Sequence, residues 1–154
     1  MKARDLMTPD PTTSRPEDDL RTVIRIMKKE DVGIVPITEG NGDQKVVGVV
    51  TDRDIALYLG EHDRRPSDVR AADVMTTSII SVEPDADIHE VSRRMQEAQV
   101  RRVLVTDGRR LTGVISTADL ARASAGSDRD RLGEEIEKVM EKVSEDTGSH
   151  RARP

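Results

Sequence analysis

The chain has 154 residues, of which 34% are apolar and 36% are charged, and its formal net charge is −5; this fits one compact domain or two small ones with a shared core, and the negative charge disfavours non-specific binding to duplex nucleic acid. Phe and Trp are absent and Tyr58 is the single aromatic residue, which argues against binding of single-stranded nucleic acid, whose bases usually stack on aromatic side chains. Cysteine is absent and the three histidines match no zinc-binding spacing, so we expect neither a disulfide nor a metal site.

The first half of the chain predicts a helix, two strands and a second helix. A proline and acidic residues, followed by apolar residues at helical spacing, indicate a helix over Pro16–Met27. Two short runs rich in β-branched residues, 34–37 and 46–50, predict buried strands, and the Gly-Asn-Gly sequence at 40–42 predicts the turn between them. A second helix is expected over 51–59.

The second half repeats this plan. It predicts a helix over 84–95, strands at 103–105 and 111–115, and a further helix that begins at Ser116. The polar segment 60–70 joins the two halves.

A tail of different character follows. Its apolar residues at helical spacing are Leu132, Ile136, Val139, Met140 and Val143. This stripe predicts a C-terminal helix that packs on the body of the protein or on a second subunit. The residues from Thr147 on are expected to be disordered.

The two halves are copies of one sequence unit. A shift of 68 residues (75 − 7) superposes Met7 on Met75. The shift falls to 65 (113 − 48) where Gly48 superposes on Gly113, because the first copy carries three extra residues in its loop at 40–44. A duplication of this kind predicts two like structural units.

Each copy is a β-α-β-β-α unit that is too small to bury its own apolar face. We therefore predict an α+β fold of two such units, related by pseudo-two-fold symmetry, with their sheets packed face to face. The expected domains span residues 7–65 and 75–130, and residues 131–154 form the C-terminal helix and the disordered tail.

In both copies a hydroxyl residue ends a strand and an aspartate follows three positions later: Thr51 and Asp54, and Ser116 and Asp119. Such a carboxylate can accept hydrogen bonds from the two hydroxyls of a ribose, and the hydroxyl and the helix N–H groups beside it can engage a sugar or a phosphate. The same spacing is that of a capping box, which satisfies helix amides without any ligand. The two roles are compatible, and the recurrence of Asp rather than the longer Glu favours a ligand-binding role in addition to capping.

At these residues the chain resembles a pair of cystathionine-β-synthase (CBS) domains, the tandem often called a Bateman module, and in particular small bacterial proteins that consist of little but the pair. The resemblance covers about Met7 to Ser124. The segments that carry it are Asp5–Thr8, Val32–Pro36 and Gly48–Asp54, with their counterparts Asp73–Thr76, Val100–Val105 and Gly113–Asp119.

The resemblance implies adenosyl ligands, such as AMP, ADP, ATP or S-adenosylmethionine, in the clefts between the units, as regulatory ligands rather than required cofactors. In a first site Asp54 would hold the ribose hydroxyls, with Thr51 beside it, and Ile34 and Pro36 would line the base pocket. Arg53 is expected to contact phosphate, because its planar fork of donors matches phosphate oxygens.

In a second site the resemblance implies the same roles for Asp119 and Ser116, with Arg102 and Leu104 at the base pocket. The second copy departs from the first because Arg102 and Leu104 replace an isoleucine and a proline, and Ala118 stands where the first copy has an arginine. The second site is therefore expected to be narrower or more phosphate-seeking, and occupancy by one ligand or by two remains open.

These observations favour a sensor of adenine nucleotides that acts on an unknown protein partner in trans, and not an enzyme, because no Ser-His-Asp arrangement stands out. The alternative is a nucleotide-free homodimer that serves as an interaction scaffold; the resemblance implies a homodimer in either case. With no signal peptide and no apolar stretch long enough to span a membrane, a cytoplasmic protein without membrane association is expected. Nucleic acid binding would depend on the arginines at 101–102 and 109–110 and is not expected.

Overall fold

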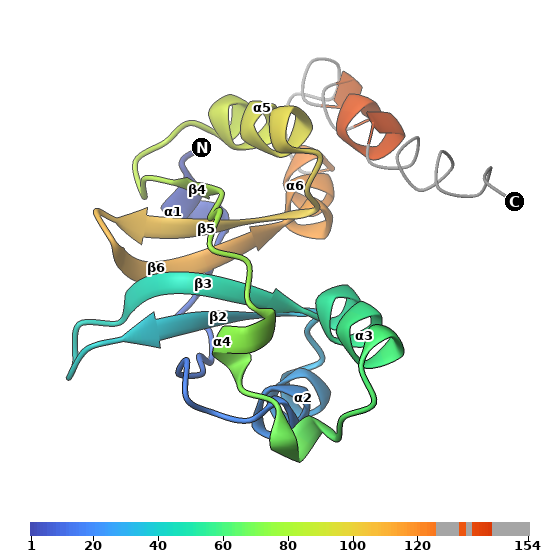
Figure 1. Ribbon diagram of the computed structural model, residues 1–154. Helices are drawn as coiled ribbons and strands as arrows, with labels where there is room; N and C mark the ends of the chain where they lie inside the picture. The colour runs from blue at the N-terminus through green and yellow to red at the C-terminus, as the bar shows by residue number, and fades with distance from the viewer. Residues whose placement is uncertain (126–132, 135–136, 143–154) are drawn as a thin grey trace, which may run out of the picture. The chain divides into compact units, whose positions relative to one another are not determined.

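The computed structural model describes residues 1–125, 133–134 and 137–142 (Figure 1). These residues form two compact units. One, the first-repeat unit, contains Asp10–Ile79 and Arg109–Leu111. The other, the second-repeat unit, contains Met1–Pro9, Ile80–Gly108 and the described residues from Thr112 on.

The first-repeat unit is a two-stranded hairpin with helices packed against it. Its elements are α2 (Leu20–Glu30), β2 (Ile34–Glu39), β3 (Lys45–Thr51), α3 (Asp52–Glu61), the 3-10 helix η1 (Pro66–Asp68) and α4 (Ala71–Val74). β2 and β3 run antiparallel, with Ile34 opposite Thr51 and Pro36 opposite Val49. This is the hairpin that the β-branched runs and the glycine turn predict.

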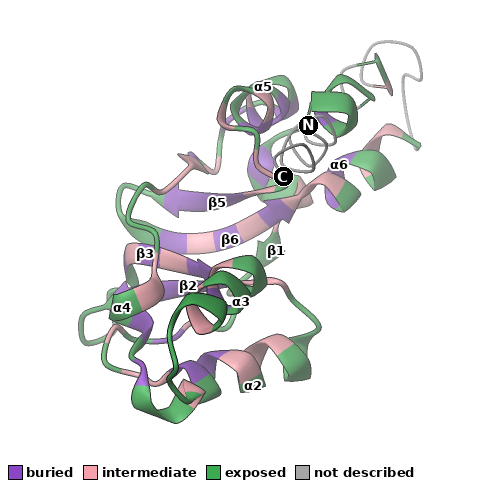
Figure 2. Cartoon of the chain, turned by 45° about the vertical axis from the view of Figure 1, so that its right-hand side comes forward, coloured by how far each residue is buried: buried purple, intermediate pink, exposed green. Residues whose placement is uncertain are grey.

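Side chains along β2 and β3 alternate between the face of the hairpin that packs into the core and the opposite face. Val35, Ile37 and Val50 are fully buried and cluster with Leu20 and Val23 of α2. Figure 2 shows buried segments, in purple, on β2 and β3. Because successive side chains of a strand point to opposite faces, the residues between these core residues belong to the face away from this core.

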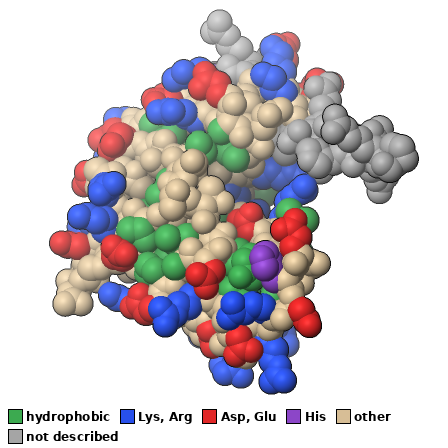
Figure 3. Space-filling view, viewed as in Figure 1, with side chains coloured by type: hydrophobic (Ala, Val, Ile, Leu, Met, Phe, Trp, Pro, Cys, Tyr) green, Lys and Arg blue, Asp and Glu red, His purple; other side chains and the backbone are tan. Residues whose placement is uncertain are grey.

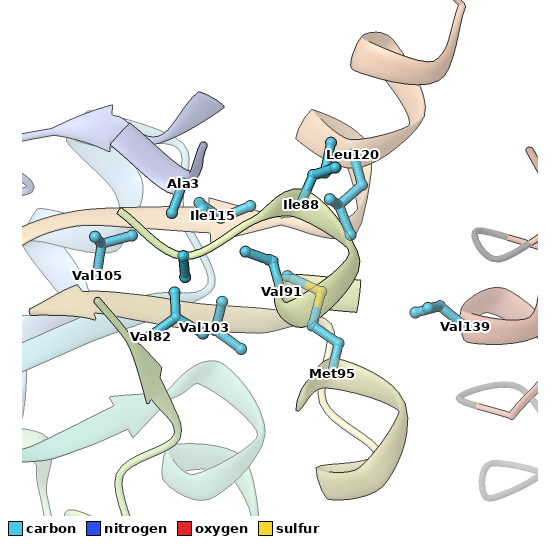
Figure 4. Packing of buried hydrophobic residues seen from close by; sticks show 11 residues of the cluster. Ala3, Val82, Ile88, Val91, Met95, Val103, Val105, Ile115, Leu120 and Val139 are labelled. Carbon is cyan, nitrogen blue, oxygen red and sulfur yellow. The ribbon is translucent and has the colours of Figure 1, made fainter. Parts of the chain in front are cut away.

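The second-repeat unit has the same plan with a longer set of paired strands. Its elements are α1 (Ala3–Leu6), β1 (Thr8–Pro9), β4 (Ser81–Val82), α5 (Ile88–Ala98), β5 (Arg102–Asp107), β6 (Arg110–Ser116) and α6 (Thr117–Ser124). β1 pairs antiparallel with β6, β6 neighbours β5, and β5 pairs in parallel with β4. Val91 and Met95 of α5 pack with Val103, Ile115 and Leu120 in one buried cluster (Figure 4).

The α+β prediction, with two repeated units, is confirmed. The face-to-face packing of the sheets and the pseudo-two-fold axis concern the placement of the two units and stay predictions.

The helices that follow Pro16 and Pro84 begin later than the prolines suggest. The side chain of Asp19 accepts a hydrogen bond from the Thr22 N–H at 2.8 Å, so α2 begins at Leu20. In the second repeat the side chain of Asp87 accepts from the His89 N–H at 2.9 Å, so α5 begins at Ile88. In both cases a capping carboxylate, and not the proline, sets the first helical residue.

The opening segment of each repeat belongs to the compact unit of the other repeat. The Ala3 N–H donates to the Ala86 carbonyl at 2.8 Å, which ties the start of the chain to the second repeat. The Leu20 N–H donates to the Val69 carbonyl at 2.9 Å, which ties the segment between the repeats to the first. The compact units therefore cut across the sequence repeats, and the domain limits given above remain a prediction.

Part of the predicted C-terminal helix lies within the described residues. Residues 137–142 are helical. Val139 is fully buried and belongs to the cluster of the second-repeat unit, whereas Met140 is 52% exposed. The other members of the predicted stripe, at 132, 136 and 143, and the tail from Thr147 on lie outside the described residues.

The surface carries basic and acidic side chains interspersed with one another (Figure 3), as a chain with 36% charged residues requires. Within the part of the chain that the structure describes, no helix is long and apolar enough to cross a bilayer.

Candidate functional site

The junction of β3 and α3 is built as a capping box. Thr51 ends β3 and is the N-cap of α3, with φ −103° and ψ 159°. Its Oγ1 accepts a hydrogen bond from the Asp54 N–H at 3.1 Å, and the Asp54 Oδ2 accepts one from the Thr51 N–H at 3.0 Å. The capping box that the spacing predicts is thus present in the structure.

The other amides at the start of α3 are also bonded within the chain. The Asp52 N–H donates to the Gly33 carbonyl at 3.1 Å, and the Arg53 N–H donates to the Asp52 Oδ1 at 2.9 Å. The helix N–H groups that the sequence offered for a sugar or a phosphate therefore already have partners at this junction. What remains for a ligand is side-chain oxygen and the surface of the strands.

Asp54 keeps one carboxylate oxygen available. Its side chain is half-buried, and within the described residues its Oδ1 makes no hydrogen bond and meets no cation within ion-pair distance. Capping through Oδ2 fixes the direction of the carboxylate, because both its own amide and its oxygen are held by Thr51. The result is an oriented acceptor at the end of β3.

The remaining first-site residues lie around this end of the hairpin. Ile34 is half-buried and stands opposite Thr51, and Pro36 is buried and stands opposite Val49. These positions alternate with the core residues, so all four belong to the strand face away from the core. Val49, which the sequence analysis did not select, lies on this face two residues before Thr51. Arg53 is exposed on the first turn of α3.

The junction of β6 and α6 has the same plan with more bonds. The Asp119 Oδ2 accepts from the Ser116 N–H at 2.8 Å and from the Ser116 hydroxyl at 2.6 Å, and the Ser116 Oγ accepts from the Asp119 N–H at 3.3 Å. The Arg122 guanidinium donates to the Asp119 Oδ1. Both oxygens of this carboxylate are therefore engaged.

Asp119 is only 9% exposed. Burial raises the pKa of its carboxyl, but the hydrogen bonds from the Ser116 side chain and backbone, together with the Arg122 guanidinium, outweigh burial and hold the pKa below its ordinary value. The carboxylate is thus ionised and satisfied by its own helix turn.

The base-pocket residues of the second site lie on β5. Arg102 is half-buried and Leu104 is 2% exposed. They alternate with Val103 and Val105 of the core, so they share the opposite face of the strand. The Thr117 N–H donates to the Arg101 carbonyl at 2.9 Å, which is the counterpart of the bond between Asp52 and Gly33.

Arg122 is the member of this junction that the sequence analysis missed. Its signal was present, because an aspartate and an arginine three residues apart on a helix face each other. The shift of 65 residues between the copies (122 − 57) places Leu57 at the equivalent position of α3. The two junctions therefore differ in one contact: a guanidinium pairs with the aspartate of the second junction, whereas a leucine stands at that position in the first.

Within the described residues no group of three His, Asp or Glu side chains is placed to hold a metal ion.

Known proteins are similar to this chain in both sequence and fold. A family model described as CBS domain matches residues 3–61 and 71–126. Protein YlbB of Bacillus subtilis is 35% identical over 128 residues, which make up 83% of this chain and 85% of YlbB. The crystal structure of hypoxic response protein I with two coordinated zinc ions is 34% identical and has a TM-score of 0.71, over 79% of this chain and 98% of that chain.

Two crystal structures with adenosyl ligands share the fold at 24% identity. One is a CBS domain pair in complex with 5′-methylthioadenosine and S-adenosyl-L-methionine, with a TM-score of 0.72 over 83% of this chain and 98% of that chain. The other is CBSX2 in complex with AMP, with a TM-score of 0.69 over 80% of this chain and 96% of that chain.

Proposed function

The chain belongs to the CBS domain family, and we propose that it is a regulatory module that binds an adenosine-containing ligand, such as AMP, ADP, ATP or S-adenosylmethionine, and acts on a separate protein partner. CBS domains are generally regulatory rather than catalytic. The chain contributes the ligand-dependent step, and the partner carries the output. Any effect of the ligand on that partner requires different affinities for two states of the module.

The Oδ1 of Asp54 is the observation that carries the proposal. It is an oriented carboxylate oxygen on a half-buried side chain, with no other partner among the described residues. The two hydroxyls of a ribose can donate to such a carboxylate, and the Thr51 hydroxyl adjoins it. Capping through the other oxygen keeps the acceptor in place before the ligand arrives, which lowers the ordering cost of binding.

The surroundings of Asp54 suit the rest of an adenosyl ligand. Ile34 and Pro36 share a strand face with Thr51. Ile34 is half-buried and offers aliphatic surface to a flat base, whereas Pro36 is buried and would form the floor beneath it. Arg53 is exposed and pairs with no acidic side chain in the described part of the chain, so its guanidinium is available to a phosphate. We assign these five residues to the first site.

The second site comprises Arg102, Leu104, Ser116 and Asp119. We expect it to be the weaker of the two for a ribose, because Arg122 occupies the carboxylate oxygen that is open in the first. The adenosine moiety shared by the ligands of the two CBS structures described above supports this class of ligand.

Isothermal titration of the full chain with AMP, ADP, ATP and S-adenosylmethionine tests the proposal. Asp54→Asn keeps an oxygen that can accept from the Thr51 N–H but removes the charge and one acceptor. We expect it to weaken binding by about 10- to 100-fold, because charged hydrogen bonds contribute roughly 1.5–3 kcal/mol each.

Asp73→Asn is the matched control. Asp73 Oδ2 accepts from the Arg70 N–H at 3.1 Å in the capping box of α4, so it has the same cap chemistry in the same unit. It should leave affinity unchanged. Titrations that show no heat with any of the four ligands, confirmed by unchanged thermal unfolding at millimolar ligand, would reject the adenosyl proposal.

A specific observation favours the second candidate, a nucleotide-free homodimeric scaffold. Both aspartates act in the capping boxes of their helices, so the motif has a structural role that needs no ligand. Leu57 on α3 is 53% exposed and could contribute to a contact with a second copy. Sedimentation velocity with and without nucleotide distinguishes the candidates, since the scaffold predicts a dimer whose stability is indifferent to nucleotide.

A further inference from the structure

We infer that Arg122 makes the junction of β6 and α6 selective for phosphorylated adenosyl ligands over uncharged ones such as adenosine, an inference that rests on the proposed function. In the junction of β3 and α3 Arg53 is also available to a phosphate, but no described guanidinium contacts the aspartate, so adenosine displaces no ion pair there. Arg122 is thus a specificity-determining residue of the second site.

The first step of the argument is the state of Asp119 without ligand. Its Oδ2 is held by Ser116 and its Oδ1 by Arg122, so a ribose can reach Oδ1 only if the guanidinium moves away. Arg122 can move, because its side chain is 75% exposed, whereas that of Asp119 is 12% exposed. The carboxylate stays and the arginine is the mobile partner.

The second step is where the displaced guanidinium goes. Side chains of a helix point back toward its N-terminus, and that of Arg122 already reaches the first turn of α6. A ligand that carries a phosphate brings a new anion to this turn, and a guanidinium binds phosphate with two parallel hydrogen bonds. Adenosine brings none, so the arginine loses its partner without gaining another.

The third step is the contrast within the chain. Leu57 occupies the equivalent position of α3, and no cation reaches Asp54 among the described residues. A ribose therefore displaces nothing at the first junction. The repeat supplies its own control, because each residue can be exchanged for the one that its counterpart carries.

The experiment isolates the second junction in the full-length Asp54→Asn protein and compares Arg122 with Arg122→Leu by titration with adenosine and with AMP. Removing the guanidinium should strengthen adenosine binding by roughly two- to fivefold, since an ion pair with an exposed partner is weak. It should weaken AMP binding by about tenfold, because the phosphate loses a charged partner. The opposite signs are the readout, since a loss of folding would lower both affinities.

Arg122→Lys keeps the charge and should bind AMP more tightly than Arg122→Leu does. Reciprocally, Leu57→Arg in the Asp119→Asn protein should weaken adenosine binding at the first junction. The inference is overturned if Arg122→Leu changes the affinities for adenosine and AMP in the same direction or not at all. It is also overturned if the Asp54→Asn protein binds neither ligand while the native chain binds both. Failure of the native chain to bind either ligand rejects the proposed function itself.

Discussion

The sulfur of Met7 lies so close to Gly113 that a Cβ built on the glycine would stand 2.5 Å from it. The other repeat has the same relationship, since a Cβ on Gly48 would stand 2.8 Å from the sulfur of Met75. Each methionine comes from the opening segment of one repeat and each glycine from the strand that precedes the candidate site in the other. The glycines therefore make room for the segments that complete the two units.

Gly113→Ala is expected to lower the free energy of unfolding by about 1–3 kcal/mol, the usual cost of overpacking. The added methyl group collides with the Cβ and Cγ of Met7 as well as with its sulfur, so a change in the far end of the side chain does not relieve it. Urea denaturation followed by circular dichroism measures the effect. Gly60→Ala is the control, because nothing lies within 4 Å of a Cβ there and alanine favours a helix over glycine, so stability should rise.

The arrangement of these methionines marks the limit of what the sequence could predict. The helices and strands of each repeat follow from local patterns, such as the alternation at 34–37 and the cap at Thr51. The contact of Met7 with Gly113 joins residues far apart in the sequence, and nothing local in either segment indicates it. Exact helix starts were missed for a different reason, because Pro16 and Pro84 resemble helix openers while Asp19 and Asp87 do the capping.

The candidate site was likewise predictable from local sequence only in part. The capping boxes at Thr51 and Ser116 follow from spacing and are present. The open oxygen of Asp54 and the covered oxygen of Asp119 depend on the residue one turn later, Leu57 or Arg122, which the motif itself does not include. An arginine at that position could have been recognised from its spacing, but its effect depends on side-chain geometry.

The lowered pKa of Asp119 predicts a pH dependence of stability. Because the carboxyl binds its proton at lower pH in the folded chain than in the unfolded chain, its contribution is fully present above the ordinary value of about 3.9 and is lost as the pH falls through the lowered pKa. The stability difference between the native chain and Asp119→Asn should therefore shrink as the pH falls below that ordinary value and through the lowered pKa. Urea denaturation at a series of pH values measures it.

Ser116→Ala provides the control for this pH dependence. It removes the hydroxyl donor to Asp119, so stability in that background should depend less on the protonation of the carboxyl. A difference between the native chain and Asp119→Asn that stays constant with pH in both backgrounds would contradict the assignment.

Val139→Ala should lower the free energy of unfolding by about 2 kcal/mol, because the side chain is fully buried and its loss leaves a cavity. Met140→Ala, one residue later and 52% exposed, should change it by less than about 0.5 kcal/mol. The pair tests whether the helical residues at 137–142 contribute to the core of the second-repeat unit. Equal effects of the two substitutions would mean that Val139 is not part of that core.

The two N-caps are expected to differ in strength. Thr51→Ala removes one acceptor, for the Asp54 N–H, and should cost about 1 kcal/mol. Ser116→Ala removes the same kind of acceptor and also the donor at 2.6 Å from the Asp119 Oδ2, and leaving a buried carboxylate short of a donor carries an added cost. We therefore expect about 2 kcal/mol for Ser116→Ala, measured as the shift in urea midpoint at pH 7. Thr51→Ser and Ser116→Thr keep the hydroxyl and should restore most of each loss; if they behave like the alanine variants, packing of the side chain and not the cap is responsible.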